Sequence, residues 1–320
     1  MRRGIFILIS VAAFLCSFGA GIASKGMLKP KAMKKYSVSW NDRLGTRKTD
    51  LPYGDGEAQK FDLYLPKDKT RSSYGLVVYL HAGGFTSGDK GGDAGMLSWL
   101  CSKGYVAAGI NYTLRTDQNT ASVFSQSEEI KAAVPEVIKA ARSAGYPIDR
   151  MAVAGGSAGH ALAMIYAYRD GADAPVPVVL TFGAVGPSSF YAQDWGIFGV
   201  GTDTEEERVH GAVLFSVMSG ERITADEIAD GSYLQKVKPI AASEWVAHNP
   251  VPTVVAYGTH DKVQPFAASR RLLAALEENH VDFKYFELPH SGHGLQNDDA
   301  ISIKWMEAVE EYLDKYMPVQ

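Results

Sequence analysis

Residues 151–164, MAVAGGSAGHALAM, constrain the fold of this chain more than any other stretch. A short apolar run leads into GGSAG at residues 155–159, and an alanine-rich segment of good helix formers follows. The pattern predicts a strand, a sharp turn and a helix. Glycines two positions before and after Ser157 suit a strained turn that lifts its hydroxyl beside unpaired helix amides. Ser157 is therefore a candidate nucleophile, although glycine and serine also dominate ordinary turns.

Strands and helices alternate along most of the sequence. Continuous apolar runs predict buried strands, and a strand of alternating pattern is expected to be half buried. The expected strands are 76–80 and 105–110, both buried, 59–65, half buried, and 151–154, 176–184, 253–257 and 281–288; the expected helices are 94–103, 127–144, 265–279 and 298–316. This alternation predicts one doubly wound α/β domain with a mostly parallel sheet over residues 51–320.

Two finer features accompany this plan. An Asp55-Gly56 pair predicts a hairpin turn before the first strand. In the helix 127–144, Ser127 is the expected N-terminal cap, and Pro135 is expected to kink or break the helix because it removes a backbone hydrogen bond.

The alternation stops between residues 186 and 249. This segment is rich in aromatic side chains, and short helices are expected around residues 203–217 and 224–229. An insertion at this point would lie over the carboxyl ends of the strands, where α/β sheets bind ligands. We interpret it as a cap whose aromatic residues are either the walls of a pocket or the cap's own core.

Residues 1–23 differ in composition from the rest of the chain. Two arginines precede an apolar run over residues 5–18, and small residues follow, which predicts a signal peptide and a secreted or cell-surface protein. The alternative is an uncleaved membrane anchor, because residues 5–23 are nearly long enough to span a bilayer. Residues 24–50 are polar and lysine-rich, and we expect a leader or linker there.

Charge and cysteine content narrow the choice of partners. The formal net charge is −4 and no long basic run occurs, so neither nucleic acid nor an anionic membrane surface is indicated, and a small molecule is the expected partner. Cys101 is the only cysteine after residue 23, which excludes a disulfide within the exported chain. The sequence leaves the oligomeric state open.

A second glycine-rich loop follows the strand at residues 76–80. It reads His81-Ala82-Gly83-Gly84-Phe85. Adjacent glycines after a buried strand let backbone amides face a ligand without side-chain interference. The amides of Gly83 and Gly84, with that of Ala158 after the nucleophile, are the candidate oxyanion hole.

A serine hydroxyl is a weak nucleophile until a base removes its proton. His293, in a glycine-flanked loop beyond the last predicted strand, is the best candidate for that base. Asp261, just beyond the strand 253–257, is the best candidate for the carboxylate that orients the imidazole. The three residues follow one another in the order serine, acid, histidine.

With these motifs the sequence resembles the α/β-hydrolase superfamily, in particular its carboxylesterases and lipases of the hormone-sensitive-lipase-like or feruloyl-esterase-like branches. These carry H-G-G-G, G-x-S-A-G and a late Asp and His, and the resemblance extends from residue 59 to the C-terminus. It implies the α/β-hydrolase fold and serine-dependent hydrolysis of small-molecule carboxylic esters through an acyl-enzyme, with no metal or organic cofactor. We expect small to medium acyl groups.

The sequence departs from that pattern at two positions. Ala82 replaces the first glycine of H-G-G-G, so residue 82 must keep a conformation that an L-residue tolerates. His160 follows the nucleophile turn where many relatives carry another glycine, and it either narrows the site or adds a polar group to it.

Several alternatives remain at this stage. His290 is a rival base, and His81 is expected to brace the oxyanion loop. A zinc site from His290, His293, Asp298 and Asp299 has the right ligand types but no supporting geometry. The same triad would also serve an amide or peptide hydrolase of exopeptidase or arylformamidase type. A further alternative is that the chain is not an enzyme but a non-catalytic binding protein with the same fold.

Overall fold

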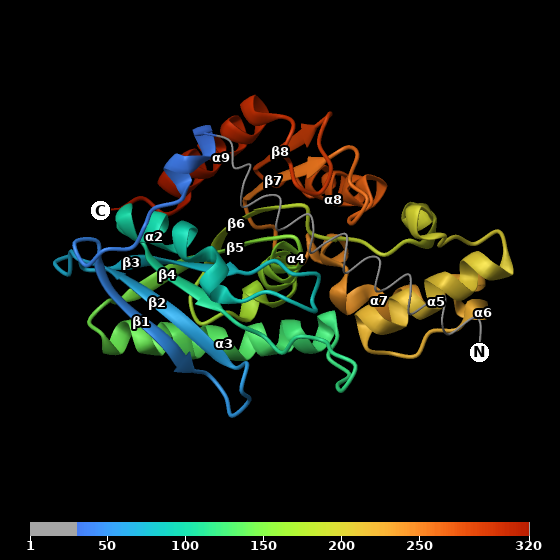
Figure 1. Cartoon of the computed structure of the whole chain (residues 1–320), viewed down its shortest axis with the longest axis horizontal. Coiled ribbons are helices and arrows are strands. Elements are labelled where there is room, and N and C mark those ends of the chain that lie inside the picture. Colours follow the sequence, from blue (N-terminus) through green and yellow to red (C-terminus); the bar gives the residue numbers. More distant parts are fainter. Residues whose placement is uncertain (1–30, 320) are drawn as a thin grey trace.

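Eight strands form one sheet in the computed structural model, which describes residues 31–319 (Figure 1). The spatial order is β1-β2-β4-β3-β5-β6-β7-β8. The strands are β1 (Gly45–Pro52), β2 (Lys60–Pro66), β3 (Tyr74–Leu80), β4 (Val106–Ile110), β5 (Ile148–Gly156), β6 (Val178–Ala184), β7 (Thr253–Gly258) and β8 (Phe283–Leu288). β2 is antiparallel to β1 and β4, and every other neighbouring pair is parallel. The predicted mostly parallel α/β sheet is confirmed.

Helices cover both faces of this sheet. The helices within residues 31–319 are α2 (Ala94–Ser102), α3 (Val123–Ser143), α4 (Ala158–Ile165), α5 (Glu205–Ser219), α6 (Ala225–Asp230), α7 (Leu234–Val237), α8 (Phe266–Glu278) and α9 (Asp299–Tyr316). Short helical turns are η1 (Lys31–Tyr36), η2 (Lys90–Asp93), η3 (Tyr166–Asp170), η4 (Gly171–Asp173), η5 (Ala192–Phe198), η6 (Lys238–Ile240) and η7 (Ala242–Trp245). α2 and α9 lie on one side of the sheet and α3 on the other (Figure 1).

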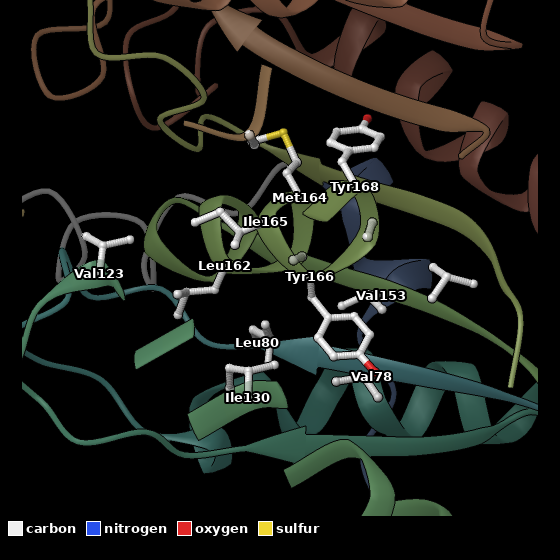
Figure 2. Close-up of a cluster of buried hydrophobic side chains, with 14 of the residues drawn as sticks. Val78, Leu80, Val123, Ile130, Val153, Leu162, Met164, Ile165, Tyr166 and Tyr168 are labelled. Carbon is white, nitrogen blue, oxygen red and sulfur yellow. The ribbon is translucent and has the colours of Figure 1, made fainter. Parts of the chain in front are cut away.

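The central strands are buried on both faces, so successive side chains enter two different cores. In β3, Val78 and Leu80 pack with α3 and α4, whereas Val77 packs with α2 and α9. Figure 2 shows the first of these cores, where Ile130 of α3 and Leu162 of α4 meet the strand side chains. These fully buried apolar side chains explain why the runs read as continuous rather than alternating.

β2 differs from the expected half-buried strand. Its alternating sequence KFDLYLP is buried from Phe61 onward, because both faces are covered. Asp62, the polar residue between Phe61 and Leu63, is only 5% exposed and forms an ion pair with Lys90 (Nζ to Oδ1, 3.2 Å). The turn predicted at Asp55-Gly56 does join β1 to β2.

α3 begins one turn earlier than expected. Its N-terminal cap is Ser122, whose hydroxyl accepts from the Ser125 amide while the Ser125 hydroxyl accepts from the Ser122 amide. The expected cap, Ser127, is a buried interior residue whose hydroxyl donates to Phe124 O (2.7 Å). The helix also continues through Pro135 without a break.

The described part of the expected leader, residues 31–50, is integrated into the domain. Tyr36 is 2% exposed and packs edge-on against Trp99, and residues from Gly45 onward form the edge strand β1. Trp40 also packs edge-on against Tyr64, but β1 is exposed along most of its length, so the segment contains few apolar residues and resembles a linker in sequence. The predicted signal peptide, residues 1–23, lies outside the described residues.

The insertion between β6 and β7 carries α5, α6 and α7, which group to one side of the sheet (Figure 1). The first two confirm the helices expected around residues 203–217 and 224–229, and α7 was not predicted. Four aromatic side chains of this cap are at most 3% exposed and contact one another: Phe190, Trp195, Phe215 and Tyr233. They form the core of the cap, so the reading of these four as pocket walls is wrong. None of the helices within residues 31–319 has the length and apolar character to span a membrane.

Candidate active site

Ser157 lies at the sharp turn between β5 and α4 that the sequence predicted. Its backbone adopts φ 52° and ψ −120°, a strained conformation for a residue with a side chain. The turn is tight because α4 starts directly against the end of β3. A Cβ atom on Gly159 would lie 1.9 Å from Leu80 O, and one on Gly155 would lie 2.7 Å from the same oxygen. The two glycines are therefore required by close backbone approach.

Three predicted residues from different strand ends form one chain of hydrogen bonds. His293 Nε2 lies 2.8 Å from Ser157 Oγ, and His293 Nδ1 lies 2.7 Å from Asp261 Oδ2. The second oxygen of Asp261 accepts from the amides of Val263 (2.7 Å) and Gln264 (2.9 Å). Because the carboxylate is held on both oxygens, it fixes the imidazole with Nδ1 protonated and Nε2 free to accept the serine proton.

The rival base, His290, is directed elsewhere. Its side chain is 77% exposed, and Nδ1 lies 2.9 Å from Asp298 Oδ1. Asp298 also accepts from the Ser291 hydroxyl, so it is used in shaping this loop. Of the residues considered for a zinc site, His293 binds Asp261, whereas His290 and Asp298 bind each other in a separate hydrogen-bond system. Within residues 31–319 no group of three or more His, Cys, Asp or Glu side chains could hold a metal ion.

The glycine loop has backbone angles that favour glycine. Gly83 and Gly84 adopt φ values of 145° and 59°, and a Cβ atom on Gly83 would lie 1.7 Å from Ser87 O. Ala82, the departure from H-G-G-G, has no positive φ. The amides of Gly83, Gly84 and Ala158 have no acceptor within residues 31–319, so they are available to an oxyanion.

His81 braces this loop, as expected. Its Nδ1 donates to Ala82 O (2.9 Å), and its ring stacks on Tyr112 with centroids 4.3 Å apart. Burial lowers the pKa of His81, which keeps the imidazole neutral. Gly88 packs directly against the hydrogen bond between His81 and Ala82, because a Cβ atom on Gly88 would lie 2.2 Å from Ala82 O.

His160 does not add a polar group to an open site. Its side chain is fully buried, and Nδ1 accepts from the Gly186 amide (3.1 Å). The ring fills the space beside Gly183, where a Cβ atom would lie 2.4 Å from Cδ2. Burial lowers the pKa of His160 to about 3. The residue is therefore a neutral packing group between α4 and the end of β6.

Sequence reasoning did not identify Ser87 and Gln126, which contact the glycine loop. Ser87 Oγ donates to Gly83 O (2.9 Å), and Gln126 Nε2 donates to Phe85 O (2.9 Å). A signal for Gln126 exists, because it is a polar residue on the apolar face of α3, between Val123 and Ile130.

Two family models match separate parts of the chain. The model described as BD-FAE matches residues 61–182, and that of the prolyl oligopeptidase family matches residues 213–320. Among curated proteins, the kynurenine formamidase of Salmo salar is 32% identical over 90 residues, which are 28% of this chain and 29% of that protein. The match therefore spans less than a third of the relative.

Several solved structures are similar over most of the chain. Esterase B from Lactobacillus rhamnosis (HN001) has a TM-score of 0.67 and 17% identity, with 96% of both chains covered. An esterase from the Planctomycetes species Thermogutta terrifontis has a TM-score of 0.65 and 16% identity, covering 86% of this chain and 94% of its own. A truncated carbohydrate esterase from gut microbiota has a TM-score of 0.63 and 17% identity, covering 85% and 98%. These likenesses show a common fold.

Proposed function

We propose that this chain, an α/β-hydrolase by its fold, is a serine hydrolase that cleaves small-molecule carboxylic esters. One observation carries the proposal: the unbroken hydrogen-bond chain from Asp261 through His293 to Ser157, on a strained turn at the sheet edge. The esterase structures and the two family models support the same chemistry.

Acylation follows from the geometry of the three residues. Ser157 Oγ attacks the ester carbonyl carbon while His293 Nε2, 2.8 Å away, takes the hydroxyl proton. Asp261 stabilises the imidazolium that forms. The tetrahedral intermediate collapses when the C–O bond to the alcohol breaks, and His293 returns the proton to the departing oxygen.

Deacylation repeats these steps with water as the nucleophile. His293 takes a proton from the water that attacks the acyl carbon, and the acid leaves as Ser157 recovers its proton. In both halves the negative oxygen is stabilised by the free amides of Gly83, Gly84 and Ala158. Removal of one such donor typically costs about 3 kcal/mol of transition-state stabilisation.

Small to medium acyl groups are the substrates we propose. The Lactobacillus esterase has been solved with a tributyrin phosphonate carrying C4 chains, and the Thermogutta esterase with propionate bound. Both ligands belong to those proteins and support, by analogy of fold, a preference for short chains here.

Amide cleavage is a second candidate, favoured by the formamidase relative and by the prolyl oligopeptidase family model. The catalytic residues would be the same, with nitrogen as the leaving atom.

We also propose export through the N-terminal segment. Two arginines followed by an apolar run and small residues support a signal peptide over residues 1–23. An uncleaved anchor is the alternative, and mass spectrometry of the N-terminus of the protein from its native host distinguishes the two.

The deciding experiment measures hydrolysis of p-nitrophenyl esters from acetate to longer acyl chains, by the native protein and by Ser157→Ala. We expect turnover of short esters and a loss of several orders of magnitude in the variant. Full activity of Ser157→Ala contradicts the proposal. An N-formyl arylamine tests the amide candidate in parallel, and absence of fluorophosphonate labelling at Ser157 indicates a non-catalytic protein.

A further inference from the structure

Among the carbonyl groups of the glycine loop, residues 81–88, those of Ala82 and Gly83 accept hydrogen bonds from donors within the loop, and that of Phe85 accepts from donors outside it. Ala82 O accepts from His81 Nδ1 (2.9 Å), and Gly83 O accepts from Ser87 Oγ (2.9 Å). All described peptide bonds are trans, so the carbonyl and the N–H of one peptide plane point in opposite directions. Fixing the Ala82 and Gly83 carbonyls therefore fixes where the amides of Gly83 and Gly84 point.

The Gly83 carbonyl is the most heavily bonded of these groups. Besides the Ser87 hydroxyl, it accepts from the amides of Thr86 (3.1 Å) and Ser87 (3.0 Å). The same peptide plane carries the Gly84 N–H at its other end, and that N–H has no acceptor within residues 31–319. Ser87 thus holds the plane of an oxyanion donor from behind without approaching the substrate.

Gln126 holds the next part of the loop. Phe85, directly after the two glycines, adopts φ 67°, a strained value for a bulky residue. Its carbonyl accepts from Gln126 Nε2 (2.9 Å) and from the Arg115 amide (3.0 Å), and Gln126 Nε2 also donates to Thr113 O (2.8 Å). One amide group therefore ties the loop to the segment after β4.

Stability alone does not explain this glutamine. Its side chain is fully buried, and Oε1 has no hydrogen-bond partner within the described residues. A buried acceptor left unpaired destabilises a fold, so Oε1 carries a cost that the two bonds donated by Nε2 must offset. We therefore explain Gln126 by its effect on the position of the glycine loop rather than by a contribution to stability.

We propose that Ser87 and Gln126 are positioning residues: Ser87 aims the Gly84 amide at the oxyanion by fixing the Gly83 carbonyl, and Gln126 holds the adjoining residue of the loop by fixing the Phe85 carbonyl. The inference rests on the proposed serine hydrolase function and adds to it the residues that set the geometry of the oxyanion hole. Neither residue touches the substrate.

The test uses the full-length protein and the rate of Ser157 phosphonylation by a fluorophosphonate. In this reaction the Oγ–P bond forms, fluoride leaves, and the hydroxyl proton passes to His293. The phosphoryl oxygen occupies the oxyanion hole, so the rate reports the hole without requiring a cognate ester. Steady-state kcat and KM for p-nitrophenyl acetate are measured on the same variants.

Ser87→Ala should lower kcat and the phosphonylation rate about tenfold, less than the loss of a whole donor, with KM changed less than about twofold. Ser87→Thr keeps a hydroxyl and should restore both to within about twofold. Gln126→Met, which keeps side-chain length without the amide, should lower them by about tenfold or more. The matched controls are Ser98→Ala and Asn249→Leu, which remove bonds of the same kind to Ala94 O and Ala167 O outside the loop.

The outcomes separate the two proposals. If Ser157 labels and turns over esters normally in Ser87→Ala and Gln126→Met, the positioning role is wrong and the hydrolase stands. If the native protein is neither labelled nor active, both fail. Equal losses in the control variants indicate general loosening and overturn the positioning role. Thermal melts followed by circular dichroism identify any variant that does not fold. If Gln126→Met does not fold, the comparison of Ser87→Ala with Ser87→Thr tests the positioning role.

Discussion

The carbonyl oxygen of Leu80 occupies the space that a side chain at Gly159 would need. A Cβ atom on Gly159 would lie 1.9 Å from that oxygen and 2.7 Å from His81 O. Leu80 ends β3 and Gly159 belongs to the first turn of α4, so this contact brings the glycine loop and the nucleophile turn together. The second glycine of G-x-S-x-G thereby links the two halves of the candidate oxyanion hole.

Gly159→Ala should therefore damage both stability and activity. Both clashing partners are backbone atoms, so β3 and α4 must move apart, and we expect a loss of about 2 kcal/mol or more in the free energy of unfolding. Gly156→Ala is the matched control, because a Cβ atom on Gly156 meets nothing within 4 Å. We expect it to be neutral or stabilising by up to about 1 kcal/mol. Urea unfolding of both variants checks this, and equal effects would show that the Leu80 contact is unimportant.

Much of the fold could be predicted because its central strands are buried on both faces and read as apolar runs. The burial of β2 and the first residue of α3 could not be predicted. β2 looked half buried because Asp62 alternates with apolar residues, and only the structure shows Lys90 pairing with it inside the protein. The start of α3 was misplaced because its capping box uses Ser125 where a glutamate or glutamine is the usual sequence signal.

The candidate site divides in the same way. Ser157, Asp261 and His293 each follow a predicted strand directly or by a short loop, so position along the chain was enough to nominate them. Ser87 and Gln126 act through hydrogen bonds to carbonyls, and any backbone carbonyl is an equally good acceptor. Their partners depend on how the loop and α3 pack, which sequence periodicity does not encode.

The two histidines of the last loop should respond oppositely to substitution. His293→Ala removes the imidazole that is hydrogen-bonded to Ser157 Oγ, and we expect kcat to fall by about 10⁴-fold or more. His290→Ala removes a surface ring bound to Asp298, and kcat should stay within about twofold. Ester hydrolysis by both variants checks the assignment. A larger loss in His290→Ala would make that residue the base.

Asp261→Asn should separate orientation from proton transfer. The asparagine amide preserves size but would place a donor or a neutral acceptor against His293 Nδ1, which favours the wrong tautomer at Nε2. We expect kcat to fall by about 10⁴-fold near neutral pH with little change in KM. Steady-state kinetics over pH 6 to 9 measure this. A variant with near-native kcat would show that the carboxylate is only structural.

Phe215→Ala should destabilise the cap. Phe215 is fully buried and contacts Phe190, Trp195 and Tyr233, so truncation leaves a cavity in the cap core. The expected cost is about 3 to 5 kcal/mol in the free energy of unfolding. Val217→Ala, at an exposed position of the same helix, is the control and should cost less than about 0.5 kcal/mol. Thermal melts of both variants decide whether these aromatics are core.

His160 should make the folded state sensitive to acid. Burial lowers its pKa from 6.5 to about 3, so between these values the unfolded chain binds a proton that the folded protein does not. Stability contributed by the neutral ring is present above pH 6.5 and is lost as the pH falls toward 3. His160→Asn keeps an acceptor for the Gly186 amide and removes this proton, so the slope of unfolding free energy against pH should fall by up to about 1.4 kcal/mol per pH unit in that window. The control is His280→Asn, at an exposed residue with φ 52° that asparagine tolerates. An unchanged slope in His160→Asn would mean that the buried ring is protonated in the folded protein.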